Sequence, residues 1–335
     1  MPGHRDFSGG RHVNFRHFFL KDPKRMWPEA TMIIIPLAVL FILGPNIYPN
    51  QSIFMELAVF IMLADALNIV YGYTGYLPFG FGVFFAIGAY GTAILISHAS
   101  WQVAPAIIAG ACFAALLSLL FTPMLRLSGA YFAISSLAAF EALYLIFSNT
   151  QLTSLTGGPY GISFTQVYNA NLDYIVAAVL AIVSAIVVLV ISKSTFGIAL
   201  QAIREDRFAV ELAGVSSLRY RTYAWLISSF VSGIAGGLYG WYQGFFYPEA
   251  VFNLTEFSVL VIVFVLFGGK GTVFGPIVGT VILFLVYEIL SLTFSSSLLI
   301  IFGLLLVVLV LFIPNGIEPL LRKTVEILRY PDGRD

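Results

Sequence analysis

Residues 193–223 read KSTFGIALQAIREDRFAVELAGVSSLRYRTY, and apolar runs too long for most soluble folds lie on both sides of this segment. Five of the 17 Lys and Arg residues of the chain lie within it, together with Glu205, Asp206 and Glu211. A long mixed-charge segment between two apolar runs indicates a structured loop that contacts another protein.

The composition indicates that lipid is the main solvent of this protein. Of its 335 residues, 59% are hydrophobic and 10% are charged, and the mean hydropathy is +0.93. A soluble domain carries about 25% charged residues, so we predict an all-α polytopic membrane protein. The net charge of zero gives no sign of nucleic-acid binding. The single Cys112 lies in an apolar run, which predicts neither a disulfide framework nor a metal cluster.

About ten apolar segments approach the length of about 20 residues that a membrane-spanning helix needs. Some are short, so a count between nine and eleven is open. The predicted spans are residues 29–46, 52–71, 83–98, 103–125, 128–149, 172–192, 222–243, 254–268, 275–293 and 297–314.

The basic residues give the orientation of these spans. With ten spans, all 17 Lys and Arg residues fall on one side of the membrane, and the positive-inside rule makes that side the cytoplasm. We therefore predict that both termini are cytoplasmic. The predicted organisation is a basic N-terminal segment at 1–28, a transmembrane domain at 29–314 with a cytoplasmic loop at 193–221, and a cytoplasmic tail at 315–335.

The stretch GYTGYLPFGFG at residues 72–82 interrupts the helical pattern. Its four glycines and Pro78 do not form a regular helix. One interpretation is a tight cytoplasmic turn between two spans. The other is a broken helix whose free N–H groups bind a carboxylate.

Acidic and amide side chains within the spans are candidates for a translocation pathway. Asp65 and Asn68 are three residues apart on one predicted helical face, and Glu141 lies well inside a span. A carboxylate at mid-bilayer costs about 2.5–3.5 kcal/mol, so it should face the bundle interior. Buried structural hydrogen bonds are the alternative, and a proton relay would use the same residues. Gly157 and Gly158 belong to TSLTGGPYGISF, which predicts an ordered outer loop.

The loop at 193–221 predicts two short capped helices. Ser194 or Thr195 can cap the first. Its apolar face consists of Phe196, Ala199, Leu200 and Ile203.

Asp206 can cap the second helix, which Gly214 ends, and Ser216 or Ser217 can cap the following span. The corner between the helices is charged. A docking element for a partner is the favoured interpretation, and an interfacial hairpin that shields the helix ends is the alternative.

The sequence offers no nucleotide site and no catalytic cluster. In GGKGTVFGP, Phe264 occupies the position of the first phosphate-loop glycine and Gly271 that of the final Ser or Thr. We expect no enzyme activity, cofactor or metal. If ATP drives this protein, another chain must hydrolyse it.

Several of these motifs resemble the permease subunits of branched-chain amino-acid ABC importers, and specifically the LivM-like member of the pair. The similar stretches run in the family's order from about Leu63 to Ile317. They are ALNIVYGYTGYLPFGFGVFFAIGAY, LSGAYFAISSLAAFEALYLI with LTSLTGGPYGI, STFGIALQAIREDRFAVELAGV and FGGKGTVFGPIVGT.

The resemblance implies a heterodimer with a second permease in a bacterial inner membrane. It also implies two cytoplasmic ATPases, an extracytoplasmic binding protein and import of branched-chain or related apolar amino acids. Glu141, Gly157 and Gly158 would lie toward the translocation path. The residues implied for ATPase coupling are Ala202, Ile203, Arg204, Glu205, Asp206, Arg207, Glu211 and Gly214.

Three alternatives are left open by the residues. A related ABC importer of urea or short amides would have the same architecture. A proton-coupled secondary transporter would use Asp65 and Glu141. A receptor or scaffold would use the charged loop without transport.

Overall fold

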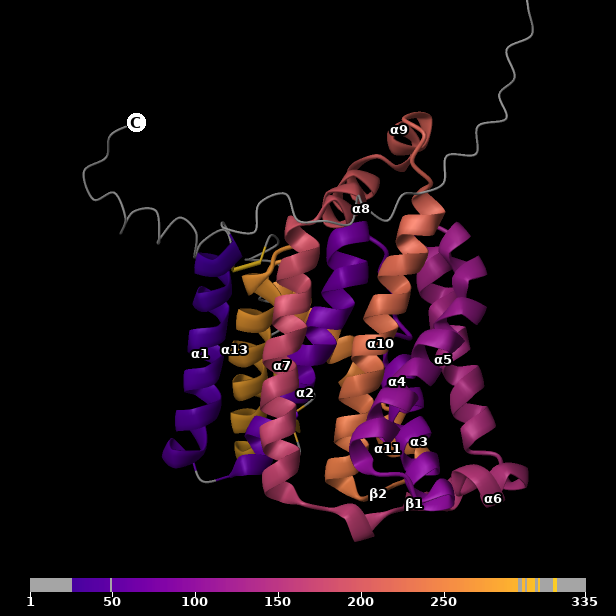
Figure 1. Cartoon of the computed structure of the whole chain (residues 1–335), viewed down its shortest axis with the longest axis vertical. Helices are drawn as coiled ribbons and strands as arrows, with labels where there is room; N and C mark the ends of the chain where they lie inside the picture. Colours follow the sequence, from indigo (N-terminus) through magenta and orange to yellow (C-terminus); the bar gives the residue numbers. More distant parts are fainter. Residues whose placement is uncertain are drawn as a thin grey trace, which may run out of the picture.

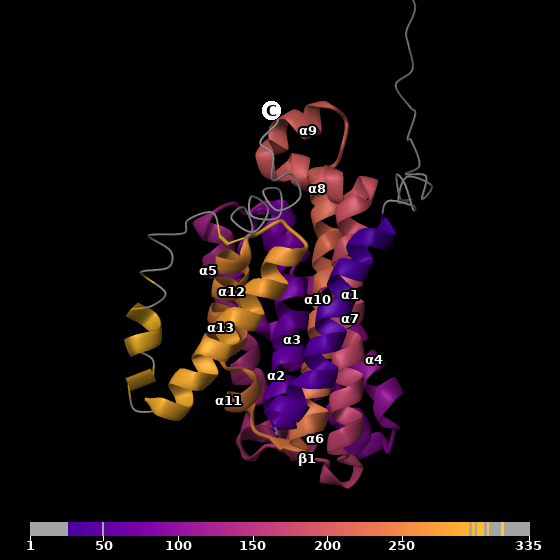
Figure 2. The same ribbon diagram turned by 90° about the vertical axis from the view of Figure 1, so that its left-hand side faces the viewer.

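The computed structural model describes residues 26–48, 50–294, 297–298, 300–304, 307 and 316–317. The long helices lie side by side and connect alternately at two opposite ends of a bundle (Figure 1). The short helices α8 and α9 stand above one end, and α6, α11 and two short strands lie at the other (Figures 1 and 2).

The long helices and the short elements follow one another along the chain. The helices of the bundle are α1 (Met26–Ile47), α2 (Gln51–Leu67), α3 (Gly82–Ala99), α4 (Val103–Leu120), α5 (Ala130–Phe147), α7 (Ala170–Lys193), α10 (Ser217–Gln243), α12 (Val261–Gly268) and α13 (Phe274–Thr293). The short elements are α6 (Thr153–Thr156), α8 (Thr195–Glu205), α9 (Arg207–Leu212), α11 (Pro248–Val251), β1 (Ile162–Ser163) and β2 (Phe245–Phe246). Two π-helices are η3 (Asn68–Gly72) and η8 (Thr255–Leu260).

The helices confirm an all-α polytopic membrane protein. In the described part of the chain, eight helical stretches are long and apolar enough to cross a membrane. Each of the first nine predicted spans corresponds to a helix that the structure describes. The tenth predicted span, 297–314, and the terminal segments 1–28 and 315–335 lie largely outside the described residues, so the count of ten stays a prediction.

The longest described helix, α10, is less apolar than the other helices of the bundle because it lies at the centre. It packs most extensively against α3 and α4 and also contacts α2 and α7. Small residues at these crossings let the backbones approach closely. A Cβ added at Gly88 of α3 would lie 2.1 Å from the Gly233 carbonyl oxygen of α10. Serines and glycines therefore replace large apolar residues on α10 because other helices, not lipid, surround it.

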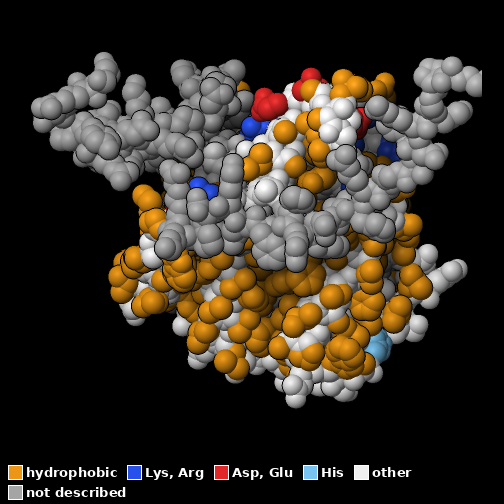
Figure 3. All heavy atoms as spheres, turned by 45° about the horizontal axis from the view of Figure 1, so that its top comes forward, with side chains coloured by type: hydrophobic (Ala, Val, Ile, Leu, Met, Phe, Trp, Pro, Cys, Tyr) orange, Lys and Arg blue, Asp and Glu red, His pale blue; other side chains and the backbone are white. Residues whose placement is uncertain are grey.

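The basic side chains gather at one end of the bundle. Figure 3 shows apolar side chains over the sides of the molecule and charged ones toward the end that carries α8 and α9. Every described Lys and Arg lies in a segment at that end, from Arg126 after α4 to Lys270 between α12 and α13. The structure thus places the described basic residues as the span count predicts.

The opposite end is closed by short elements. β1 pairs antiparallel with β2, with Ile162 opposite Phe246. Phe246 also packs edge-on against Tyr90 of α3, with ring centroids 5.1 Å apart. The loop between α5 and α7 is therefore fixed to α3 and to the end of α10.

Candidate functional site

The helix α8 rests on the chain's own spans. Ser194 caps it by accepting a hydrogen bond from the Gly197 N–H at 3.1 Å. Its buried face includes Phe196, Leu200 and Ile203, as the 3.6-residue period predicts, whereas Ala199 is half-buried. Phe196 and Leu200 join a small apolar cluster formed by η3, α7 and α10, separate from the main core. The apolar side of α8 is therefore the face of the loop that packs against the chain's own spans.

The helix α9 instead extends away from the bundle. Asp206 caps it by accepting hydrogen bonds from the Phe208 and Ala209 N–H groups at 2.9 and 3.1 Å. The chain leaves the helix through Gly214, whose φ of +83° favours glycine. The side chains of Phe208 and Leu212 are 71% and 91% exposed. Four residues apart, they form an apolar pair on one face of the helix.

The last predicted cap of this loop is wrong. Ser216 stands at the N-cap position of α10 but makes no side-chain capping bond, and the Ser217 hydroxyl is buried without a partner in the described part of the chain. Tertiary packing against neighbouring helices sets the start of α10, and a local cap does not.

Two arginines tie the corner between α8 and α9 to the interrupted segment below it. Arg204 donates from Nη1 to the Gly72 carbonyl at 2.7 Å and from Nη2 to Glu205 at 3.1 Å. Arg207 pairs with Glu211 one turn later, at 3.3 Å between Nε and Oε1. A hydrogen bond to the Tyr76 side chain raises the pKa of Arg207 above its ordinary value. The corner is thus held from beneath by residues 72–76.

The residues predicted for ATPase coupling divide between a buried and an exposed set. Ile203 is 3% exposed and belongs to the face on which α8 rests. Arg204 and Arg207 are half-buried in the contacts just described. The exposed members are Ala202, Glu205, Asp206, Glu211 and Gly214.

A cleft opens beside this corner at the same end of the bundle. Its volume is about 750 Å³, and it lies between the interrupted segment, the start of α5 and the α8–α9 corner. Its lining combines charged, aromatic and small side chains, among them Tyr76, Phe79, Ser128, Phe132, Asp206 and Lys270.

Two N–H groups of the interrupted segment are bound by side chains of other helices. The chain is non-helical between Thr74 and Gly82, as the glycines and Pro78 predict. The Gly80 N–H donates to the Ser136 hydroxyl of α5 at 3.3 Å, and the Gly82 N–H donates to the Ser258 hydroxyl of η8 at 2.8 Å. The start of α3 is therefore a packing junction whose amides are satisfied by two other helices, and this geometry favours the turn over the carboxylate site.

Asp65 and Asn68 have separate partners although they are three residues apart. The Ser184 hydroxyl of α7 donates to Asp65 at 2.8 Å, and the Asp65 carboxyl is fully buried. Asn68 donates to the Thr272 carbonyl at 2.7 Å and accepts from the Gly271 N–H at 2.8 Å. The wider π-helical turn that begins at Asn68 directs its side chain toward the α12–α13 turn.

The other predicted pathway residues lie apart from this pair. Glu141 is exposed on the outer face of α5, between exposed apolar residues such as Ile134 and Leu145, so the expectation that it faces the bundle interior is wrong. Gly157 and Gly158 adopt φ of +77° and +53° directly after α6, which lies at the opposite end of the bundle from α8 and α9 (Figure 1). The structure does not bring these residues into contact with Asp65 or Asn68.

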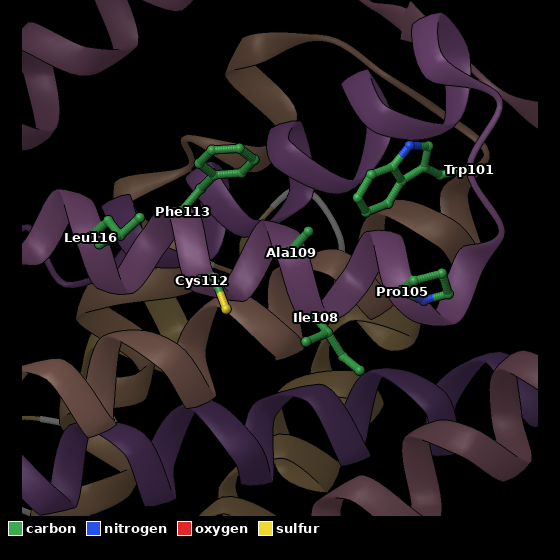
Figure 4. A pocket seen from close by; sticks show the side chains of 7 residues that line it. All are labelled: Trp101, Pro105, Ile108, Ala109, Cys112, Phe113 and Leu116. Atoms are coloured by element: carbon green, nitrogen blue, oxygen red, sulfur yellow. The ribbon is translucent and has the colours of Figure 1, made fainter.

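An apolar groove runs along the outer side of α4 (Figure 4). Its volume is about 410 Å³, and its lining is Trp101, Pro105, Ile108, Ala109, Cys112, Phe113 and Leu116. It offers no charged group for the ends of an amino acid, and it lies on the side of α4 away from its buried residues. This groove fits hydrocarbon, not a zwitterion.

The fold and the site together define a class of protein. It is a multi-pass helical membrane protein with a capped, partly exposed helical pair at its basic end. The chain belongs to the family described as branched-chain amino acid transport system / permease component, whose model matches residues 51–313.

Curated relatives agree with this family. The chain is 30% identical to the high-affinity branched-chain amino acid transport system permease protein LivM of Salmonella typhimurium, over 95% of this chain and 81% of the relative. It is 30% identical to the Escherichia coli protein of the same description, over 89% of this chain and 77% of that one. A probable LivM of Methanocaldococcus jannaschii is 27% identical over 59% of this chain and 62% of its own length. No solved structure matches the chain significantly. These relatives are transport permeases and not enzymes.

Sequence reasoning missed four residues that organise the site. Tyr76 and Arg221 stack beneath the α8–α9 corner, with the Arg221 carbon Cζ 4.2 Å from the centre of the Tyr76 ring. Ser136 and Ser258 hold the start of α3. No local signal identifies them, because each contacts a residue far away in the sequence.

Proposed function

We propose that this chain is the transmembrane permease subunit of an ATP-driven importer of branched-chain or related apolar amino acids. It forms half of the translocation pathway with a second, homologous permease. Two cytoplasmic ATPases supply the energy, and an extracytoplasmic binding protein delivers the substrate. The domain is 29–314, residues 193–221 face the cytoplasm of a bacterial inner membrane, and both termini lie on that side.

The observation that carries this proposal is the exposed apolar pair on α9, in a chain of this permease family. Phe208 and Leu212 belong to α9, which stands outside the bundle at its basic end (Figure 2). Exposed large apolar side chains at an aqueous end favour a protein interface. We propose that this pair enters the ATPase while Arg204 and Arg207 hold the corner to the bundle.

The exposed Glu141 supports a pathway along α5. A carboxylate in the middle of a span is costly against lipid, yet no described residue covers Glu141. The second permease and the water-filled path between the two chains would provide its surroundings. The proton-relay alternative is less favoured, because Asp65 is fully buried against α7 and does not share a site with Glu141.

The proposed function is tested with the whole transporter. The chain is purified with the permease, ATPases and binding protein of its neighbourhood, reconstituted in liposomes, and assayed for ATP hydrolysis and uptake of tritiated leucine. Loaded binding protein should stimulate ATP hydrolysis and uptake together. An intact assembly that shows neither, or uptake by this chain alone under a pH gradient, would overturn the proposal.

The pathway is tested with two variants at one position. Glu141→Leu should assemble normally and lower leucine uptake, whereas Glu141→Gln, which keeps size and hydrogen bonding, should retain more of it. If this face of α5 lies against lipid, Glu141→Leu would instead be more stable and fully active, which would contradict the assignment.

A further inference from the structure

Tyr76 stands where three parts of the structure meet. It belongs to the non-helical segment between η3 and α3. The Arg221 guanidinium of α10 lies over its ring, 4.2 Å from the centroid. The Phe132 ring of α5 meets it edge-on at 5.4 Å. Arg207 of α9 lines the same cleft as Tyr76 and interacts with its side chain. One side chain therefore contacts α5, α9 and α10.

The buried Arg221 makes the position of this ring energetically important. Arg221 is 3% exposed, and its Nε and Nη1 atoms have no hydrogen-bond partner among the described residues. No described carboxylate forms an ion pair with it. A buried cation without an anion is costly, and the aromatic face of Tyr76 offsets part of that cost. The ring and the guanidinium should therefore move as a unit.

A series of ring contacts continues from Tyr76 into the bundle. Phe132 packs against Trp225 of α10 with centroids 5.8 Å apart, and Trp225 packs against Phe84 of α3 at 4.9 Å. Close-packed interiors transmit displacements because they compress little. A shift of Tyr76 must therefore move α5 or rearrange these rings.

The upper end of the segment is fixed to α8. Arg204 holds the Gly72 carbonyl at 2.7 Å. A Cβ at Gly75, whose φ is +77°, would lie 3.1 Å from the Arg204 Cγ. The segment thus cannot slide freely under the corner, and a movement of α8 and α9 reaches Tyr76 directly.

We propose that Tyr76, through its stack with Arg221, is the positioning residue that transmits movement of the α8–α9 corner to α5. This inference rests on the proposed function, since α9 is the part that the ATPase would move and α5 carries Glu141. Tyr76 contacts neither substrate nor nucleotide in this role. It sets the position of α5 in response to α9.

The test is the number of leucine molecules transported per ATP hydrolysed by the reconstituted complete transporter. Tyr76→Leu removes the aromatic face and should lower this ratio about tenfold, on the scale of a desolvated cation–π contact, while ATP hydrolysis continues. Tyr76→Phe keeps the ring contacts with Arg221 and Phe132 and loses only the hydroxyl, so its ratio should fall clearly less than that of Tyr76→Leu. Tyr48→Leu, at the outer end of α1, is the matched control and should change nothing.

A second variant separates transmission from stability. Arg221→Met replaces a buried, unpaired cation by an apolar side chain of similar length, so its thermal stability should be unchanged or higher. Its transport ratio should nevertheless fall as for Tyr76→Leu. Normal coupling in Arg221→Met, or equal losses in Tyr76→Phe and Tyr76→Leu, would overturn the inference. Failure of the unmodified transporter to respond to loaded binding protein would instead refute the proposed function.

Discussion

Truncation of Leu212 tests the proposed docking surface most directly. The side chain is 91% exposed and makes almost no contribution to the bundle. Leu212→Ala removes the equivalent of about three methylene groups, each of which contributes about 0.8 kcal/mol when buried. If an ATPase subunit buries this side chain, the variant should lose about 2 kcal/mol of binding free energy, or roughly 30-fold in Kd.

The assay measures the Kd of the purified ATPase for the permease pair in lipid nanodiscs. Leu292→Ala is the matched control, because Leu292 is 67% exposed near the end of α13, at the opposite end of the bundle from α9. It should leave the Kd unchanged. Leu212→Ala should not lower the thermal stability of the permease, since exposed substitutions change it by about 0.5 kcal/mol or less. A Kd within about twofold of the original for both Leu212→Ala and Phe208→Ala, against the roughly 30-fold loss expected from their burial, would refute the docking role of α9.

Two further predictions concern the structure that supports this surface. Asp206→Ala removes the cap of α9 and should lower the stability of that helix by about 0.5–2 kcal/mol. The loss should appear as faster amide hydrogen exchange at 207–213. Unchanged protection of these amides would contradict the capping role. Gly236→Ala places a Cβ 1.8 Å from the Phe85 carbonyl oxygen, whereas a Cβ at Gly303 meets no atom within 4 Å. Gly236→Ala should therefore lower the stability of the permease by about 1–3 kcal/mol in thermal unfolding, whereas Gly303→Ala should not. Equal unfolding midpoints for the two variants would show that α3 and α10 are not so closely packed.

Much of this protein follows from local features of the sequence. Apolar runs of bilayer length predict the spans because lipid offers no hydrogen bonds to the backbone. The cap of α8 at Ser194 or Thr195, the cap of α9 at Asp206 and its end at Gly214 follow from the sequence because capping depends on neighbouring residues alone, and the structure selects Ser194. The same rule failed at Ser216, where α10 enters the bundle and packing decides its first turn.

Only the tertiary structure decided how these parts work together. Sequence spacing placed Asp65 and Asn68 on one helical face, but the π-helical turn gives them different partners. Spacing also could not tell that Glu141 faces outward, or that Tyr76 lies over Arg221, 145 positions further along the numbering of the chain. Local hydrogen bonds and lipid solvation fix the helices and their orientation. Contacts between distant residues depend on how the helices pack, and they determine which side of the charged loop is anchored and which is free for a partner.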